Sequence, residues 1–475
     1  MDGYTLGTRT EVFADGIMAD SLKGASLRQH APEYRNVAIA FDKPWDSQLT
    51  GYFSVVQRGN GALLYYRGRL DENIGGNTHV QDTDDAQVTG LAVSDDGVRF
   101  EHRPTHVLDL PAYPDNNLVW RGVISHNFTA FYDENPNCPE NERFKAVGGL
   151  SPAFYRADIP NGLFILVSPD GVHWKKTGAP GVFGDTALDS QNAIFYDTHA
   201  GLYRCYMRTW ARMVDDGKPL YCEEAFGDKD GRNIRAIQSA TSADLAHWSK
   251  PVANEYGDRP LQQFYTNSVV PMPGAEHVLL SFPNRFFPER KRVSEHYKHG
   301  ISDTCLMASR DGVNWKRLFM EAWIRPGIER ENWKDRCRMV ARGMHVAADG
   351  TLSVYVGAHF RSESIHLDRC TLRPCGFVSV NAPWSGGEVL TPALRYGSGT
   401  LRLNYSTSAG GGVRADVVDA ETLEPLCERE APVLYGDAYQ EAYPGWQANE
   451  AFAGRPVRLR FRLWDADVYA FSIRP

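Results

Sequence analysis

Ser168-Pro169-Asp170-Gly171-Val172-His173-Trp174 is one of four copies of a short turn motif in this chain. The other copies span 94–100, 242–248 and 309–315, and successive first serines are 74, 74 and 67 residues apart. An Asp-Gly pair between strand-forming residues favours a tight hairpin, because Asp bonds its own backbone and Gly supplies a positive φ. Repetition at this period indicates one supersecondary unit used several times. We expect the closing Trp or Phe of each copy to pack between neighbouring sheets.

Each copy follows a strand-like run, and another pair of strand-like runs stands about 40 to 50 residues upstream. In the second unit these runs are 128–132, 143–147 and 163–167. The segment that follows the turn supplies one more strand. Each unit therefore has four strands, which is the content of one propeller blade. A fifth unit, ending in the run 377–380, has Arg373-Pro374-Cys375-Gly376-Phe377 in place of the Asp-Gly turn. The sequence therefore predicts an all-β fold built on a five-bladed β-propeller.

Two domains are expected. The propeller takes residues 1–381, and one of the short runs 12–15 and 37–41 supplies the strand that closes the ring onto the last blade. Residues 382–475 change to alternating apolar and polar positions, as in Leu401-Arg402-Leu403-Asn404-Tyr405. That alternation is typical of a half-solvated antiparallel sheet and predicts a small C-terminal β-sandwich. We expect the sandwich to be a structural partner or a contact surface for a homo-oligomer.

Composition narrows the class of function. The net charge of −8 argues against a nucleic-acid or anionic-membrane partner, and no apolar run approaches the length of a membrane span. The acidic, polar start Met1-Asp2-Gly3-Tyr4 and eight cysteines without a Cys-x-x-Cys pair predict a cytoplasmic protein with reduced thiols. Histidines and carboxylates do not occur together at metal-ligand spacing, so neither a metal nor a cofactor is expected.

The ligand site of a propeller is usually its central funnel, lined by the first residues of the innermost strands and the ends of the second strands. Those positions hold amides, aromatic rings and arginines here, a mixture typical of carbohydrate sites. An oligosaccharide is therefore the expected partner. The predicted binding residues are Trp45, Arg67, Arg121, His126, Asn127, Gln191, Arg208, Trp210, Tyr265, Asn267, Arg285 and Arg342.

Two carboxylates across a funnel suffice for glycosidic cleavage by acid and base, or by acid and nucleophile. Asp46 is the predicted base or nucleophile, and Asp189 the second carboxylate, which orients substrate or acts as the acid. Glu224 or Asp303 is otherwise the acid. A structural role competes with each assignment: Asp46 and Asp189 could cap strand turns, and Glu224 could lie in a solvated loop.

The repeat number, the appended sandwich and the acidic funnel resemble the five-bladed propeller glycosidases. These are the invertase/levanase group (glycoside hydrolase family thirty-two) and the arabinanase/xylosidase group (family forty-three). Segments 126–129, 142–146, 188–192, 264–267 and 309–312 look like bacterial proteins labelled family thirty-two-like. The resemblance implies a hydrolase or transglycosidase that acts at the end of an oligosaccharide, on a furanoside such as a fructo- or arabinofuranoside. The invertase motif Trp-Met-Asn-Asp-Pro-Asn-Gly is absent, and Pro44-Trp45-Asp46 is its loose positional counterpart.

Sialidases are a second comparison, since they repeat a turn one residue longer and grip a carboxylate with three arginines. Arg67, Arg208, Arg285 and Arg342 could form such a cluster. Three hypotheses thus remain open. The first is a glycosidase, the second a lyase or sialidase-like enzyme on an acidic sugar with Tyr265 or His126 as base, and the third a non-catalytic carbohydrate-binding propeller.

Overall fold

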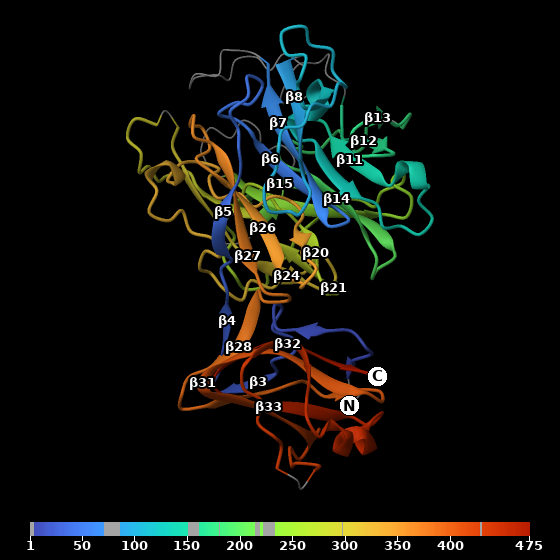
Figure 1. Ribbon diagram of the computed structural model, residues 1–475, viewed down its shortest axis with the longest axis vertical. Coiled ribbons are helices and arrows are strands. Elements are labelled where there is room, and N and C mark those ends of the chain that lie inside the picture. Colours follow the sequence, from blue (N-terminus) through green and yellow to red (C-terminus); the bar gives the residue numbers. More distant parts are fainter. Residues whose placement is uncertain are drawn as a thin grey trace.

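The computed structural model describes residues 4–70, 86–150, 161–179, 181–213, 219–221, 233–296, 298–427 and 430–475. Within these ranges the regular structure consists of β-strands and short 3-10 helices, as the absence of helical periodicity predicts. Figure 1 shows two layers, a ring of sheets above and a further sheet below that holds both chain ends.

The first three blades each contain four main antiparallel strands. The strands of every sheet pack against a neighbouring blade on each face, so β7 is buried at all nine positions. Blade one is β6 (Gly51–Arg58), β7 (Gly61–Arg69), β8 (Gln87–Ser94) and β9 (Leu118–Arg121); blade two is β10 (Thr129–Tyr132), β11 (Phe144–Gly148), β12 (Phe164–Ser168) and β13 (Lys175–Lys176); blade three is β14 (Ala193–Asp197), β15 (Leu202–Met213), β17 (Asn233–Ser242) and β18 (Val252–Ala253), with β16 (Pro219–Tyr221) beside β15.

Blade four is divided into two small sheets. One contains β20 (Val270–Met272), β21 (Ala275–Ser281) and β24 (Met307–Ser309), and the other β19 (Gln263–Phe264), β22 (Asn284–Phe287) and β23 (Ile301–Thr304). The division falls at Pro283, which has no N–H to offer a ladder. Its carbonyl still accepts a hydrogen bond from Cys305 N, at 3.1 Å, so the two pieces stay joined.

Blade five is closed by the N-terminal part of the chain. Its strands are β25 (His345–Val346), β26 (Leu352–Ala358) and β27 (His366–Leu372), and β5 (Glu33–Ala40) pairs antiparallel with β27 as the outermost strand. One of the runs 12–15 and 37–41 was expected to close the ring, and the run 37–41 does so. The run 377–380 is not a strand of this blade, because β28 (Val378–Ala382) pairs with β4 and β33 in the other sheet.

The lower sheet has ten strands and combines the two ends of the chain. Four come from the N-terminal residues that the sequence assigns to the propeller: β1 (Tyr4–Thr5), β2 (Glu11–Val12), β3 (Ser21–Lys23) and β4 (Ser26–Gln29). The others are β28, β29 (Gly387–Leu390), β30 (Leu394–Arg395), β31 (Thr400–Asp419), β32 (Asp437–Ala442) and β33 (Val457–Arg474). The expected boundary at 381/382 therefore shifts, because residues 4–29 form ladders with the C-terminal strands.

The repeated turns connect neighbouring blades. In each of three copies the carbonyl of the turn glycine accepts a hydrogen bond from a buried tyrosine of the preceding blade: Tyr65 to Gly171 (2.7 Å), Tyr206 to Gly312 (3.0 Å) and Tyr355 to Gly97 (2.5 Å). The aromatic residue that ends the same copy lies edge-on to that tyrosine, at centroid distances of 5.3–5.8 Å. The packing predicted for the closing Trp or Phe is confirmed in these three copies.

The two layers share one hydrophobic core. A single cluster of buried side chains extends from blades four and five into the lower sheet. It includes Met272, Leu280, Phe282, Val354, Leu403 and Phe461. The ring and the lower sheet are therefore packed together as one body.

Candidate active site

Two tyrosines meet where the inner strands of the ring begin. Tyr52 starts β6 in blade one, and Tyr265 follows β19 in blade four; their hydroxyl oxygens are 3.0 Å apart. Both side chains are buried. The carbonyl of Tyr265 accepts hydrogen bonds from Ser190 Oγ (2.6 Å) and Arg208 Nη2 (3.1 Å). Residues of three blades thus fix the position of one phenol.

Asp189 and His126 stand beside this pair. His126 follows β9 through a short 3-10 helix, η2 (Val123–His126), and its Nε2 lies 3.0 Å from Asp189 Oδ1. Its Nδ1 lies 2.9 Å from Gln87 Oε1, at the start of β8. The Asp189 side chain keeps 29 % of its surface exposed, so this carboxylate can be reached from the funnel.

Four guanidinium groups surround the two tyrosine rings. The Arg336, Arg208 and Arg235 Cζ atoms lie 4.6, 4.7 and 5.9 Å from the centroid of Tyr265. Arg67 Cζ lies 4.7 Å from the centroid of Tyr52. Cations over an aromatic face are attracted by the ring quadrupole, which helps to hold these like charges together.

The charges set the protonation states. Burial raises the pKa of Asp189, but the hydrogen bond and charge of His126 and the charges of Arg208 and Arg336 outweigh it, so the pKa lies well below its usual range. Burial likewise raises the pKa of Tyr265, yet Arg336, Arg208 and the hydrogen bond with Tyr52 bring it below 10.0. Burial and the Tyr265 and Asp189 charges hold the pKa of Tyr52 well above 10.0. Asp189 is therefore an ionised carboxylate, and either hydroxyl of the tyrosine pair can be the donor in their hydrogen bond.

Backbone strain gathers around the same end of the ring. Tyr52, Ser268, Arg336, Arg338, His359 and Arg361 all have φ between 42° and 63°. This left-handed region is disfavoured for residues with a Cβ and is retained where the surroundings enforce it, commonly at functional sites. Seven further described non-glycine residues with positive φ, from His106 to Asp465, lie elsewhere in the chain, so strain is present at this end of the ring but is not confined to it.

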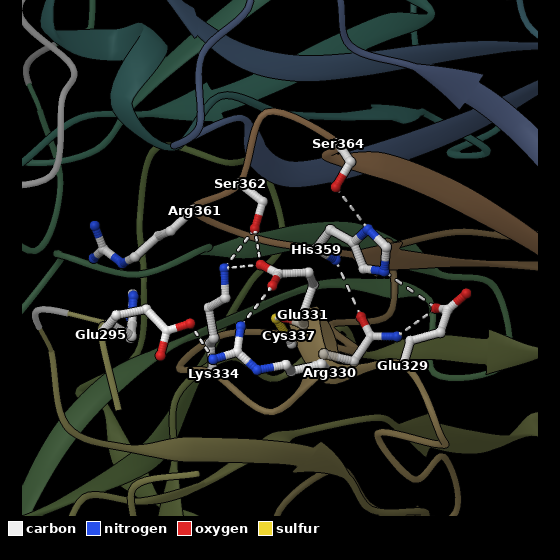
Figure 2. Close-up of polar contacts among 12 residues, drawn as sticks. Glu295, Glu329, Arg330, Glu331, Lys334, Cys337, His359, Arg361, Ser362 and Ser364 are labelled. Carbon is white, nitrogen blue, oxygen red and sulfur yellow. Dashed lines mark hydrogen bonds and ion pairs between the residues drawn. The ribbon is translucent and has the colours of Figure 1, made fainter. Parts of the chain in front are cut away.

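A polar network at the rim supports Arg336. Figure 2 shows His359 between Ser364 and Glu329, with Nδ1 2.9 Å from Ser364 Oγ and Nε2 3.2 Å from Glu329 Oε2. Nearby, Ser362 donates to Glu331 (2.6 Å) and Lys334 pairs with the same carboxylate.

The rim network reaches the centre through Asp335. Arg361 Nε lies 3.1 Å from Asp335 Oδ1, and His296 Nε2 lies 3.0 Å from the same oxygen. These contacts fix the residue that precedes Arg336. Asp335 Oδ2 also lies 3.6 Å from Arg336 Nε, so this carboxylate pairs with one of the arginines at the tyrosine pair.

Of the predicted residues, Arg67, His126, Asp189, Arg208 and Tyr265 meet at this centre. Trp210 lies close by in β15, with the Cζ atoms of Arg235 and Arg208 at 5.2 and 5.8 Å from its ring. Arg121, at the end of β9, is exposed. Glu224 lies outside the described residues.

Asp46 and Trp45 lie away from the centre. The Asp46 side chain is 1 % exposed, accepts a hydrogen bond from Lys43 N (3.1 Å) and lies 3.4 Å from His102 Nε2. Trp45 packs on Val88 and Leu118 and donates to Asn117 Oδ1 (2.6 Å). Asp46 thus has the turn-capping position that competed with its predicted catalytic role.

Asp303 is held in a bidentate ion pair. It faces Arg285 across β22 and β23, with Nε and Nη2 at 2.8 and 2.7 Å from its two oxygens. Both side chains are nearly buried. A carboxylate bound by both oxygens has little capacity left for a substrate, so this pair stabilises blade four.

The predicted amides and Arg342 bind backbone at the axis of the ring. Asn127 donates to three carbonyls, Asn267 to those of Gln191 and Tyr206, and Gln191 to Phe53 O at 2.8 Å. Arg342 donates to Ala130 O at 3.4 Å between the rings of Phe131 and Phe195. These contacts join the inner strands beneath the tyrosine pair and make the floor of the site.

Tyr52, Gln87, Arg235 and Arg336 belong to the site but were not predicted. Tyr52 lies within β6, whereas the residues predicted for this part of the site, Trp45 and Asp46, precede the strand. Arg235 lies within β17. Arg336 lies in 325–343, where no repeat or alternation marks a position in a blade. Tyr52 stands near the start of an innermost strand, and the first residues of these strands were expected to line the funnel. The sequence therefore did contain a signal for Tyr52.

No group of three or more metal-ligating side chains occurs among the described residues. In the same part of the chain, no helix is long and apolar enough to cross a membrane.

No protein-family model matches the chain, and no curated protein matches it. Among solved structures, a glycoside hydrolase is 14 % identical over 75 % of this chain and 95 % of its own, with a TM-score of 0.46. A structure from work on mannoside phosphorylases and on glycoside hydrolases that target β-1,2-mannosidic linkages in Candida mannan is 15 % identical over 73 % and 95 %, with a TM-score of 0.42. A glycosyl hydrolase from Bacteroides ovatus is 16 % identical over 73 % and 95 %, with a TM-score of 0.41.

Proposed function

We propose that the protein is an enzyme that cleaves a glycosidic bond of an oligosaccharide at the centre of its propeller. The observation that carries the proposal is the meeting of Asp189 with the Tyr52–Tyr265 pair. An ionised, solvent-accessible carboxylate stands there beside a phenol of lowered pKa. Perturbed ionisable groups that meet beside strained backbone are characteristic of catalytic centres.

In the reaction, the bond between the anomeric carbon and the leaving oxygen breaks, and water adds its hydroxyl to that carbon. Asp189 stabilises the positive charge that develops on the sugar ring, or attacks the anomeric carbon directly. His126 positions Asp189 and keeps it ionised. The proton required by the leaving oxygen comes from a second acid, for which Glu224 remains the candidate.

The closed floor of the site favours action at a chain end. Gln191, Asn267 and Arg342 bridge the inner strands below the tyrosine pair, so a sugar chain has no passage through the ring axis. A terminal residue can enter such a cup, whereas an internal residue needs an open groove. Ring size is left to the test, in which furanosides, the expected class, stand beside pyranosides and uronides.

The test is release of chromophore from aryl glycosides, with furanosides, pyranosides and uronides in one panel. Asp189→Asn and Tyr265→Phe should each reduce kcat/KM on the responding substrate by about 100-fold or more. The matched controls Asp170→Asn, in an outer turn, and Tyr203→Phe, in β15, should keep their rates. Full activity in both central variants would refute the assignment. Sugar binding with no turnover would instead favour the carbohydrate-binding propeller.

A further inference from the structure

The centre of the site carries more positive than negative charge. Arg67, Arg208, Arg235 and Arg336 surround the tyrosine pair, while the described carboxylates beside them are Asp189 and Asp335, whose Oδ2 lies 3.6 Å from Arg336 Nε. The chain as a whole has a net charge of −8. A positively charged site in an acidic protein attracts anionic ligands and gives no such attraction to neutral sugars.

Two of these arginines have hydrogen-bonding capacity that the protein leaves unused. Arg208 donates from Nη2 to Tyr265 O (3.1 Å), and Arg235 donates from Nη1 to Gln263 Oε1 (2.7 Å). The Nε of each is buried and has no partner. A buried N–H without an acceptor is costly, and a guanidinium has five donors to satisfy.

The charges around Arg235 are correspondingly unfavourable. Burial and the neighbouring Arg208 lower the pKa of Arg235 to about 10. In the adjoining blade, Arg285 has a carboxylate partner: its Nε and Nη2 donate to the two oxygens of Asp303. Arg208 and Arg235 lack such a carboxylate partner among the described residues.

We propose that Arg208 and Arg235 bind a carboxylate of the substrate, which makes the terminal sugar an acidic one such as a uronic or sialic acid. The inference rests on the proposed function and adds the substrate class. A planar carboxylate satisfies two guanidinium donors side by side, as Asp303 does on Arg285. Bound there, it lies against Tyr265, with Asp189 left free to act on the anomeric carbon.

Binding tests the proposal without requiring turnover. The probes are glucuronate, galacturonate and N-acetylneuraminate, with glucose and galactose as neutral counterparts and inorganic phosphate and sulfate as simple oxyanions. We expect calorimetric affinity for at least one sugar acid to exceed that for its neutral counterpart by about tenfold or more. Arg235→Lys and Arg208→Lys should remove this preference, because lysine cannot bind bidentately, while the exposed control Arg99→Gln should retain it.

Measurements of catalysis distinguish the proposal of an acidic substrate from the proposal of glycoside cleavage. If uronides and sialosides are cleaved and Arg235→Lys lowers their kcat/KM while neutral glycosides stay inert, both proposals stand. If neutral glycosides are cleaved and Arg235→Lys has no effect on them, glycoside cleavage stands and the acidic substrate is refuted. Binding of sugar acids without any cleavage supports the carboxylate site and overturns the enzyme. Equal binding of phosphate and sugar acids would refute recognition of an acidic sugar.

Discussion

At the scale of single residues, the turn glycines have a role that extends beyond the turn. Gly171 has φ 81°, and a Cβ there would lie 2.7 Å from the Tyr65 hydroxyl that donates to its carbonyl. The position therefore requires glycine for two reasons, the left-handed backbone and the close approach of the neighbouring blade. In the copy at 242–248, Leu245 takes the same place with φ 67°.

Removal of one inter-blade hydrogen bond should lower stability measurably. We expect Tyr65→Phe to reduce the free energy of unfolding by about 1 kcal/mol, because the carbonyl of Gly171 loses the shorter of its two side-chain hydrogen bonds and keeps that from Trp174 Nε1 at 3.1 Å. Urea unfolding at pH 7 measures the change. Tyr34→Phe is the control, since Tyr34 is 59 % exposed. An unchanged midpoint for Tyr65→Phe would show that the link contributes nothing to the ring.

At the scale of elements, the N-terminal strand β2 is attached to blade four by charge. Glu11, fully buried, accepts from Arg310 Nη2 at 2.8 Å and lies 3.4 Å from His277 Nε2; Arg310 also pairs with Asp15. Burial raises the pKa of Glu11, but the hydrogen bonds and charges of His277, Arg310 and Arg9 lower it to about 2. The carboxylate is therefore stabilised as the anion.

This attachment makes stability depend on pH. A folded pKa near 2, below the ordinary 4.5, stabilises the fold above about pH 4.5 and ceases to do so as the pH falls toward 2. Glu11→Gln should cost roughly 3 kcal/mol at pH 7, and the gap to wild type should narrow below pH 4. Urea midpoints at pH 7, 4 and 3 measure this; a gap that stays constant would contradict the pairing.

Elements were predictable where the signal is local. The Asp-Gly turns carry their conformation in four to seven adjacent residues, so the repeat predicted the blades and their inter-sheet aromatics. Which strand joins which sheet is decided by distant partners, and that is why β28 and residues 4–29 were assigned to the wrong layer. Arg336 and Asp335 depend on a loop without periodicity. Asp303 looked catalytic because its partner, Arg285, is 18 residues away in sequence.

At the scale of the whole molecule, the ring and the lower sheet should unfold together. The N-terminal segment supplies four strands to one and the closing strand to the other, and the two share a buried core. Hydrogen exchange in increasing urea should therefore give the same opening free energy for β7 and β33, within about 1 kcal/mol. Separate transitions would show two independent units.

Deletion of residues 1–30 should leave unpaired strand edges and yield aggregated protein.

The pairing of Ala40 with His366 also has a consequence for synthesis. A ribosome adds about 5–20 residues per second, so the first strands emerge roughly 15 to 65 seconds before the strands they must join. During that interval an open ring of nascent blades has two bare edges, each able to capture a strand of another chain. Production of the native protein should consequently benefit from chaperones that hold the N-terminal segment until translation of the last blade is complete.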